Sequence, residues 1–467
     1  MNLQKLNIDP RIELTQLFGH FSDEPWALLL DSANSVHLNS QADMLLARPL
    51  AHITTYGQQS HVVHGENEHA AQSEDDPLIL VERLLKRYFP DAIAASSHPS
   101  IAFGCGAAGY FAYDLGRRFE RLPSMAKQEC LAPDMAVGIY SWALLRQRNT
   151  GEFFLASHPR YPAPAPEYFE TLAKEVKAAA PFALTGPWQS NMSKTEYVQK
   201  LGRIHEYLLS GDCYQVNLAQ RFDAPYEGDE WQAYLALREA NKAPFSAFMR
   251  LEKQCILSIS PERFLSVNQG KVQTKPIKGT RPRDKDPEID RRSAEELLHA
   301  EKDRAENLMI VDLLRNDLSK HCRPGSVQVP HLFEIESFPA VHHLVSTVEG
   351  KLNADASALD LLRGAFPGGS ITGAPKIRAM EIIEELEPHR RHIYCGSIGY
   401  LTPTGEMDTS ICIRTLLCEQ GKLYCWAGGG IVLDSDPELE YQETLHKVDK
   451  ILPVLAAMKN ATDNKAN

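Results

Sequence analysis

The sequence predicts an α+β protein built around a mainly antiparallel β-sheet system. Strand-like and helix-like segments follow one another without the regular βαβ alternation of a parallel sheet, and no internal repeat runs along the 467 residues. The hydrophobic and charged fractions, 43% and 24%, are those of a globular protein. At this length the chain can form one large domain or two to three ordinary ones.

Strand and loop signals divide the first 190 residues. After a lead-in of roughly 20 residues, residues 25–32 read as a buried strand, and the polar stretch 60–77 is expected to be a surface loop. Residues 104–120 are apolar with interleaved aromatic side chains, so a helix or strand packed in the core is expected there. Proline alternates with alanine at 162–166, and this predicts that 159–190 connects two parts of the chain over the surface.

The element boundaries are clearer beyond this connection. Ser193 and Glu196 form a capping box that opens an amphipathic helix through Leu209, and Gly211 ends it. The pattern predicts further helices at 287–320 and 375–386 and a last one ending at 458, strands at 213–222, 255–267, 393–401, 409–418 and 422–433, and a disordered tail at 459–467.

Composition excludes several classes of function. The net charge of −12 argues against bulk nucleic-acid binding and against an anionic membrane surface, so local positive groups or a metal must bind any anionic substrate. No apolar run of 18 residues is present and the first residues are not charged and then apolar, so neither a membrane span nor a signal peptide is expected. Nine scattered cysteines without a C-x-x-C pair indicate reduced thiols and a cytoplasmic location.

Lys278 lies in the segment Pro-Ile-Lys-Gly-Thr at 276–280, at the end of a predicted strand and near Arg281 and Arg283. Cationic neighbours disfavour an ammonium group, so Lys278 is a candidate amine nucleophile. A basic strand end at the surface is the alternative interpretation.

Glu262 is the candidate partner of this lysine. A hairpin turn centred on Gly270 pairs Glu262 with Lys278, and cross-strand partners lie about 5 Å apart at Cβ. A carboxyl group and an amine held in this way supply an acid and a nucleophile for one small substrate. A structural salt bridge explains the same pair.

Two predicted helices carry paired carboxylates. Asp303 and Glu306 are three residues apart, as are Glu440 and Glu443, so each pair shares one helix face. Together they form a candidate cage for a hard divalent cation, most naturally Mg²⁺. Two solvated acidic faces are the alternative.

Two glycine-rich segments are candidate anion sites. In 366–376 a proline begins a helix, whose free N–H groups face the preceding loop. Three consecutive glycines at 428–430 allow backbone N–H groups to converge on a carboxylate, although a β-bulge explains them too.

His343 and Arg414 are further candidates. Arg414 stands in an apolar strand pattern, where an arginine is costly unless it is paired, so it is either a structural ion-pair member or a carboxylate clamp. His343 is either structural or part of a site.

Taken in order, five segments resemble the chorismate-utilising family, which includes anthranilate, isochorismate and salicylate synthases and the enzymes that make 4-amino-4-deoxychorismate. The segments are Gly-Asp-Cys-Tyr-Gln-Val-Asn-Leu-Ala-Gln-Arg-Phe at 211–222, Ser-Pro-Glu-Arg-Phe at 260–264, Ile-Val-Asp-Leu-Leu-Arg-Asn-Asp at 310–317, Phe-Pro-Gly-Gly-Ser-Ile-Thr-Gly-Ala-Pro-Lys at 366–376 and Ala-Gly-Gly-Gly-Ile-Val at 427–432. The resemblance is strong over residues 193–455 and weaker before them. It implies a single large domain of layered antiparallel sheets with flanking helices, like that of anthranilate synthase component I, with an N-terminal region at 1–158, a connecting segment at 159–190 and a chorismate-binding catalytic region at 191–458.

Two positions separate the reactions within the family. Anthranilate synthases typically carry alanine in place of Lys278, and isochorismate and salicylate synthases generally place a water-activating lysine where this chain has Gln215. The resemblance therefore implies formation of 4-amino-4-deoxychorismate from chorismate and ammonia, on the route to p-aminobenzoate and folate. Anthranilate formation is the alternative.

The resemblance also implies the roles of individual residues. Lys278 would attack C2 of chorismate, Glu262 would act as general acid and base, and Glu306 and Glu443 would bind Mg²⁺, with Glu440 and Asp303 in the outer shell. The implied substrate contacts are His343, Thr372, Tyr400, Arg414, Gly428, Gly429, Gly430 and Lys447.

The resemblance implies one partner and one further ligand. A glutamine amidotransferase subunit would supply the ammonia, because no nucleophilic cysteine in a glycine-flanked elbow is found in this sequence. Trp26 and Ser32 lie where relatives bind tryptophan, as inhibitor or as structural ligand, although a buried strand and its turn explain them equally.

Overall fold

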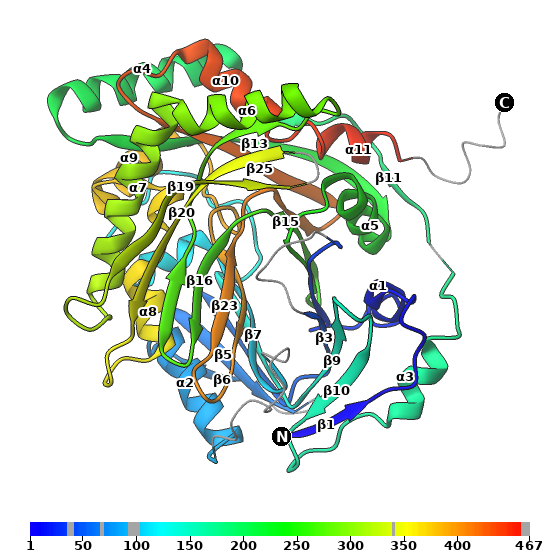
Figure 1. The fold of residues 1–467 in the computed structure, drawn as a ribbon. Helices are drawn as coiled ribbons and strands as arrows, with labels where there is room; N and C mark the ends of the chain where they lie inside the picture. Colours follow the sequence, from blue (N-terminus) through cyan, green and yellow to red (C-terminus); the bar gives the residue numbers. More distant parts are fainter. Residues whose placement is uncertain (35–41, 66–69, 92–102, 179, 339–340, 459–467) are drawn as a thin grey trace, which may run out of the picture.

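The computed structural model describes residues 1–34, 42–65, 70–91, 103–178, 180–338 and 341–458. Its strands form two large sheets of 13 and 12 strands, and within each sheet the strands pair antiparallel. Helices cover the outer faces and the ends of the sheets (Figure 1). The predicted α+β class with layered antiparallel sheets is confirmed.

The first sheet combines strands from both ends of the chain. Its strands are Asn2–Lys5 (β1), Leu28–Asp31 (β2), Ala42–Leu46 (β3), Trp142–Gln147 (β9), Phe153–Ser157 (β10), Phe182–Leu184 (β11), Gln189–Ser190 (β12), Gln215–Gly228 (β13), Phe245–Arg250 (β14), Gln254–Ser260 (β15), Gly373–Ala374 (β21), Thr415–Glu419 (β24) and Lys422–Ile431 (β25). The order is β1-β10-β9-β3-β2-β14-β15-β24-β25-β13-β11, with β12 and β21 paired to β13.

The second sheet also combines strands from distant parts of the chain. It contains Ala51–Tyr56 (β4), Gln59–His64 (β5), Ala71–Ser73 (β6), Gly106–Phe111 (β7), Met135–Tyr140 (β8), Arg263–Asn268 (β16), Lys271–Thr274 (β17), Ile277–Pro282 (β18), Gln328–Ser337 (β19), Val341–Lys351 (β20), Ser397–Leu401 (β22) and Met407–Ile411 (β23). The order is β18-β20-β17-β16-β23-β22-β7-β8-β4-β5-β6, with β19 paired to β20.

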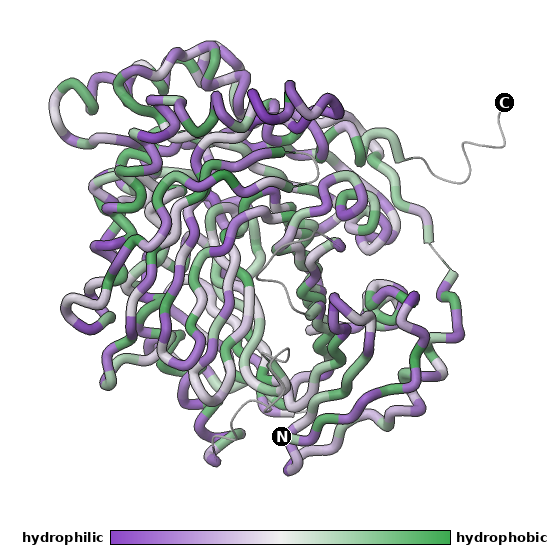
Figure 2. Tube along the Cα trace, viewed as in Figure 1, coloured by the Kyte–Doolittle hydropathy of each residue, from purple (hydrophilic) through white to green (hydrophobic). Residues whose placement is uncertain are grey.

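The helices are short to medium in length. They are Leu14–Phe18 (α1), Pro77–Tyr88 (α2), Pro166–Leu172 (α3), Lys194–Ser210 (α4), Glu230–Asn241 (α5), Pro287–His299 (α6), Glu301–Ser319 (α7), Ala358–Ala365 (α8), Lys376–Leu386 (α9), Pro437–His446 (α10) and Leu452–Ala456 (α11), with 3₁₀ turns at Tyr113–Arg118 (η1) and Gly369–Ile371 (η2). The capping box of Ser193 and Glu196 is present at the start of α4, and Gly211 ends this helix in a left-handed conformation. In Figure 2 the coils of α6 and α10, at the top of the molecule, are mostly hydrophilic.

The central strands of the first sheet, such as β2, are buried on both faces. Successive residues of β2 point to opposite faces, so Leu28 joins the large core that contains Tyr110 and Leu265 of the second sheet, whereas Leu29 packs with Phe18 and Trp231 under α1 and α5. A strand buried on both faces reads as a continuous apolar run, and this explains why 25–32 was recognisable as a buried strand.

Several predicted elements differ from the structure. The stretch 60–77 is not a loop, because β5, β6 and the start of α2 lie within it. The helix predicted at 287–320 is two helices, since Ala300 adopts an extended conformation with ψ of 105° between α6 and α7. The predicted strands 255–267 and 409–418 each divide into two strands, β15 and β16 in the first case and β23 and β24 in the second, which belong to different sheets.

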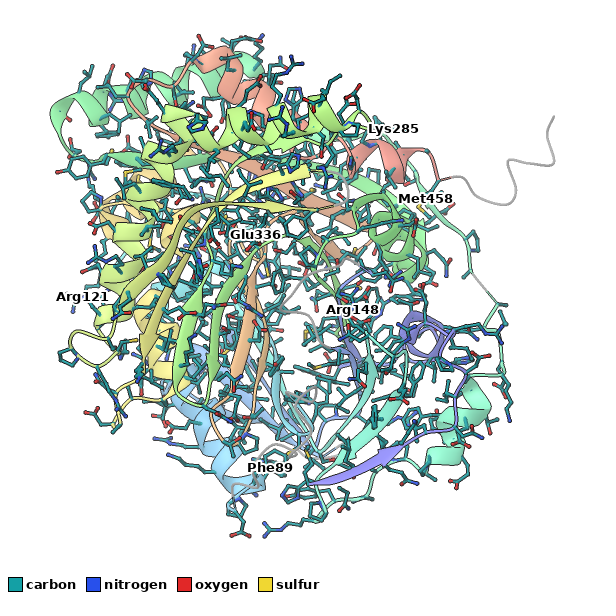
Figure 3. All side chains as sticks on the ribbon, in the orientation of Figure 1. Phe89, Arg121, Arg148, Lys285, Glu336 and Met458 are labelled. Carbon is teal, nitrogen blue, oxygen red and sulfur yellow. The ribbon has the colours of Figure 1, made fainter. Side chains whose placement is uncertain are left out.

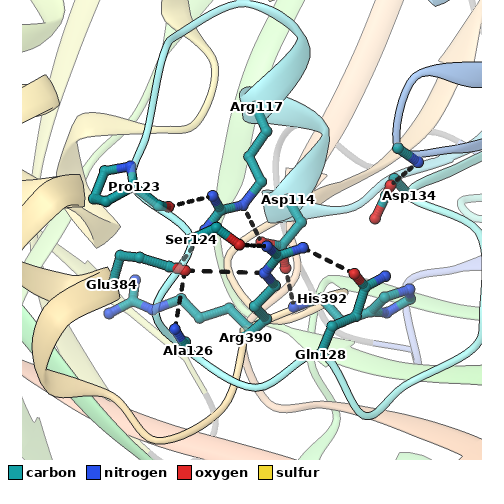
Figure 4. A network of polar contacts seen from close by, with 12 residues as sticks. Asp114, Arg117, Pro123, Ser124, Ala126, Gln128, Asp134, Glu384, Arg390 and His392 are labelled. Atoms are coloured by element: carbon teal, nitrogen blue, oxygen red, sulfur yellow. Dashed lines mark hydrogen bonds and ion pairs between the residues drawn. The ribbon is translucent and has the colours of Figure 1, made fainter.

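A polar network joins α9 to residues 114–126 (Figure 4). The buried Glu384 of α9 accepts hydrogen bonds from the backbone N–H groups of Met125 (2.8 Å) and Ala126 (3.1 Å) and forms an ion pair with Arg117. Arg117 also pairs with Asp114 at 3.1 Å. The network thus ties α9, which directly follows the glycine-rich segment 366–376, to the N-terminal part of the chain.

None of the helices in the described ranges is long and apolar enough to cross a membrane. All nine cysteines lie within these ranges and are free and buried. The tail predicted at 459–467 lies outside the described residues.

Candidate active site

Glu262 lies where the chain passes from one sheet to the other. β15 of the first sheet ends at Ser260 and β16 of the second begins at Arg263, so Glu262 occupies the crossing itself. Its side chain is buried and accepts a hydrogen bond of 3.3 Å from the Ser370 hydroxyl. Burial raises the pKa of Glu262 to about 7, although the ammonium of Lys278 acts in the opposite direction. A carboxyl group with this pKa can both give and take a proton near neutral pH.

Lys278 projects from a bulge in β18. The register against β20 shifts between Ile277, paired with Val345, and Thr280, paired with His343, and Gly279 adopts a φ of +79° within this shift. Bulges of this kind redirect a side chain. The ammonium of Lys278 lies 3.4 Å from the backbone carbonyl oxygen of Ser370.

Glu262 and Lys278 are therefore neighbours, as predicted, but they are not cross-strand partners. The β16–β17 hairpin pairs Asn268 with Lys271, and β18 then leaves the hairpin to pair with β20. Ser370 joins the two groups instead, since its hydroxyl contacts the carboxyl group and its carbonyl oxygen contacts the amine.

The carboxylates of Glu306, Glu440 and Glu443 approach one another from α7 and α10. A Cβ atom at Gly429 would lie 3.1 Å from Glu440 Oε2 and 3.6 Å from Glu443 Oε1, so both carboxylates of α10 lie against the glycine segment of β25. Burial raises the pKa of Glu306, with Glu440 and Glu443 acting in the same direction and Lys278 opposing them. Burial acts to raise the pKa of Glu443 too, but Lys447 outweighs it and the pKa is lowered.

Lysines neutralise these carboxylates in the structure. Lys447 lies 2.7 Å from Glu443, and Lys302 lies 3.3 Å from Glu440 and 4.0 Å from Glu306. Within the described residues no three His, Cys, Asp or Glu side chains are arranged so as to hold a metal ion.

Asp303 is not part of this carboxylate group. It pairs with Arg281 at 3.0 Å, and a Cβ atom at Gly279 would lie 2.8 Å from its carboxyl carbon. Asp303 therefore lies beside the bulge that carries Lys278, and its predicted place in an outer metal shell stays a prediction.

Arg414 occupies a second crossing between the sheets, next to that of Glu262. It lies between β23 and β24 with a φ of +51°, outside the strand in which it was predicted. Its backbone carbonyl oxygen accepts a hydrogen bond from Ile259, but within the described residues its guanidinium has neither a hydrogen bond nor an ion pair. Burial lowers the pKa of Arg414 while Asp449 acts in the opposite direction, so the choice between a structural role and a carboxylate clamp stays a prediction.

His343 lies close to Arg414, near the start of β20. Its Nδ1 is 2.9 Å from the Thr280 hydroxyl, and Glu336, labelled in Figure 3, is its partner on β19. Burial, together with Arg414, lowers the pKa of His343 to about 4, so the imidazole is neutral in the range where enzymes usually work.

The two glycine-rich segments meet at the start of β13. Thr372 is fully buried, and its carbonyl oxygen accepts a hydrogen bond from Asn217, which itself pairs with Gly430. Gly428 to Gly430 lie within β25, and close packing, not a turn, requires glycine at 428, where a Cβ atom would lie 2.5 Å from the backbone oxygen of Leu218. At Gly430 a Cβ atom would lie 2.5 Å from Nε2 of the Gln215 side chain, which would have to move. Lys447 donates a hydrogen bond to the Gly428 carbonyl oxygen at 2.8 Å.

Three predicted site residues, Tyr400, Trp26 and Ser32, make their contacts with residues outside the site described above. Tyr400 on β22 packs against Phe103 with ring centroids 5.1 Å apart. Trp26 stacks on His52 and donates to Glu252 at 2.8 Å, whereas the Ser32 backbone N–H donates to Asp43 at 2.9 Å. The tryptophan site predicted at Trp26 and Ser32 stays a prediction.

Sequence reasoning missed two residues of the site. Ser370 stands in a recognised motif, yet no local signal shows that its two ends hold Glu262 and Lys278. Lys302 is four residues before Glu306 in α7, and this spacing alone predicts a contact between them.

An amine beside a buried proton donor, a group of carboxylates and an arginine define a site for a small anionic substrate. The model of the chorismate binding enzymes matches residues 27–453, and the chain belongs to this family. The anthranilate synthase component I of Streptococcus pneumoniae TIGR4 has the same fold, with a TM-score of 0.76 and 29% identity over 89% of this chain and 93% of that one.

Two relatives are more similar in sequence. The aminodeoxychorismate synthase component 1 of Klebsiella aerogenes is 54% identical over 435 residues, which are 93% of this chain and 95% of that protein. The protein of the same name from Escherichia coli K12 is 52% identical over 438 residues, 94% and 95% of the two chains.

Proposed function

We propose that this chain converts chorismate and ammonia to 4-amino-4-deoxychorismate. The placement of Lys278 beside Glu262, through Ser370, is the observation that carries the proposal. The identity above 50% with two proteins named aminodeoxychorismate synthase component 1 supports it.

Lys278 and Glu262 both act in each of the two halves of the reaction. The lysine amine forms a bond to C2 of chorismate while the C4–O bond breaks, and Glu262 gives its proton to the departing hydroxyl, which leaves as water. Ammonia then bonds to C4 and the C2–nitrogen bond breaks, which releases the lysine. Glu262 takes up the proton that ammonia loses, so both residues return to their starting state.

The carboxylate group has the kind of ligand atoms that a magnesium ion binds. Glu306, Glu440 and Glu443 offer only oxygen, which Mg²⁺ prefers, and their mutual repulsion favours a cation between them. Burial raises the pKa of Glu306, and Glu440 and Glu443 add to this effect. Glu306 and Glu443 would hold the ion, with Glu440 and Asp303 further out, and the ion would neutralise the ring carboxylate of the substrate.

Removing the metal is expected to abolish turnover. Excess EDTA should eliminate product formation, and Glu443→Ala should raise the Mg²⁺ concentration for half-maximal activity by at least about tenfold. The melting temperature should not fall, because half of the Glu443 side chain is exposed (49%). Glu438→Ala, on the exposed side of the same helix, is the control and should change neither quantity. Unchanged activity in EDTA would remove the metal from the proposal.

Arg414 is expected to bind a substrate carboxylate. A hydrogen bond to a charged group contributes about 1.5–3 kcal/mol, so Arg414→Gln should raise KM for chorismate about ten- to hundredfold and lower kcat less. Steady-state kinetics in saturating ammonium measure both constants. A fall in kcat at constant KM would instead assign Arg414 to the transition state alone.

Incubation of the purified chain with chorismate, Mg²⁺ and ammonium tests the reaction itself. We expect 4-amino-4-deoxychorismate to accumulate without release of pyruvate. Pyruvate together with anthranilate fluorescence would support the alternative, anthranilate formation.

A glutamine amidotransferase subunit is the proposed source of ammonia. The words "component 1" in the relatives' names imply a second component. We expect glutamine to replace ammonium as the nitrogen source only when such a subunit is added. Binding of tryptophan at Trp26 and Ser32 is proposed separately, and calorimetric titration with tryptophan would test it.

A further inference from the structure

Ammonium groups face the carboxylates in the absence of a metal ion. Three carboxylates, those of Glu306, Glu440 and Glu443, lie within electrostatic reach of three ammonium groups, those of Lys278, Lys302 and Lys447. Two of these lysines, Lys278 and Lys447, also act on Glu262. A divalent cation placed among the carboxylates would be repelled by the ammonium groups at close range, and it would bind more tightly if one of them moved away.

Lys302 differs from the other two lysines in its contacts. It begins in the first turn of α7 and spans to α10, with its Nζ 3.3 Å from Glu440 Oε1 and 4.0 Å from Glu306 Oε1. Lys447 also holds the backbone carbonyl oxygen of Gly428, and Lys278 holds that of Ser370. Lys302 contacts the carboxylates with its ammonium, and 54% of its side chain is exposed.

The carboxylates that Lys302 contacts are, in contrast, held in place. Glu440 is buried and its Oε1 also accepts a hydrogen bond of 2.7 Å from Ser435, and the Glu306 side chain is 17% exposed. A half-exposed lysine can move its ammonium into solvent, and the buried carboxylates then need another cation to compensate their charge. Fixed carboxylates with a movable ammonium between them form a site whose cation can be exchanged.

We propose that Lys302 is a resident counter-cation, which occupies the space between Glu306 and Glu440 in the free protein and is displaced by the divalent cation. The proposal rests on the metal assignment made for the proposed function. It states that Lys302 weakens metal binding, whereas a residue that positions the carboxylates for the metal would strengthen it.

Calorimetric titration of the full chain with Mg²⁺, in the absence of chorismate, tests the direction of the effect. Lys302→Met removes the charge and keeps the length of the side chain, and we expect its Kd for Mg²⁺ to be about tenfold lower than that of the parent protein. Lys302→Arg keeps the charge and should bind Mg²⁺ about as weakly as the parent.

Lys194→Met is the matched control. Lys194 pairs with Glu438 of the same helix α10, and 49% of its side chain is exposed, but it does not contact the carboxylate group. Lys194→Met changes the net charge of the protein by the same amount as Lys302→Met, and it should leave the Kd for Mg²⁺ unchanged.

Thermal melting gives an independent readout. Without Mg²⁺, Lys302→Met leaves its carboxylates without their counter-cation, so Mg²⁺ should raise its melting temperature more than it raises that of the parent. Lys302→Gln is a second neutral variant and should behave in the same way if Lys302→Met folds poorly.

An unchanged or higher Kd in both neutral variants would overturn the proposal, while Mg²⁺ binding by the parent would leave the metal assignment intact. If neither the parent nor any variant binds Mg²⁺, with or without chorismate, the metal assignment fails and the proposal fails with it.

Discussion

Lys278→Ala is expected to lower the rate of 4-amino-4-deoxychorismate formation by at least about 10³-fold, because the amine that bonds to C2 is gone. Lys278 stands in a bulge of β18 and its ammonium has one long hydrogen bond, to Ser370, so the melting temperature should change little. Product formation measured by chromatography at saturating chorismate and ammonium gives the rate.

Lys271→Ala controls for loss of a positive charge from the same region. Lys271 lies on β17, pairs with Glu349 at 2.8 Å and is 60% exposed, so its removal should leave the rate unchanged. A Lys278→Ala variant that retains more than a tenth of the parent rate would exclude nucleophilic attack by this residue.

Glu262→Gln is expected to lower kcat about 10²- to 10⁴-fold, because the amide cannot donate a proton to the departing hydroxyl. The parent needs the protonated carboxyl group for this step, and burial raises the pKa of Glu262 to about 7. The parent rate should therefore fall as the pH rises through about 7, and the variant's residual rate should not show this fall. Rates of single turnovers between pH 6 and 9 measure the effect.

The thermal stability of Glu262→Gln tests the direction of the pKa shift of Glu262. A carboxyl group with a raised pKa binds protons more strongly in the folded state, so the parent loses stability as the pH rises from its ordinary pKa through about 7. Glu262→Gln should therefore melt no lower than the parent at pH 8. A lower melting temperature at this pH would indicate that Glu262 is a structural ion-pair partner of Lys278, and not a buried acid.

The fold was predictable where a local signal determines the structure. The capping box of α4, its glycine end and the turn at 268–270 depend on neighbouring residues alone, and the structure contains each of them. The break at Ala300 was not predictable, since alanine favours helix. Both α6 and α7 pack on β18, β19 and β20, and this long-range packing has no local sequence signal. The polar strands β5 and β6 were missed because they form the end of the second sheet, where few apolar side chains are needed.

The site was predictable as a set of residues but not as a geometry. Both crossings between the sheets, at Glu262 and at Arg414, are short polar breaks with apolar residues on either side, so each segment was read as one strand. The paired carboxylates of α7 and α10 followed from helical spacing, whereas Ser370 became visible only when the loop before α9 was placed between the two sheets. Contacts between residues that are far apart in the sequence set these positions, and no short stretch of sequence contains both partners of such a contact.

The central claim is that the Lys278 amine forms a bond with a carbon of the substrate. The most direct test is intact-protein mass spectrometry after incubation with chorismate and Mg²⁺ in the absence of ammonia, followed by peptide mapping. We expect the protein to gain the mass of chorismate less one water, with the addition on the peptide that contains Lys278 and absent from Lys278→Ala. An adduct that persists in Lys278→Ala, or that maps to another residue, would contradict the account.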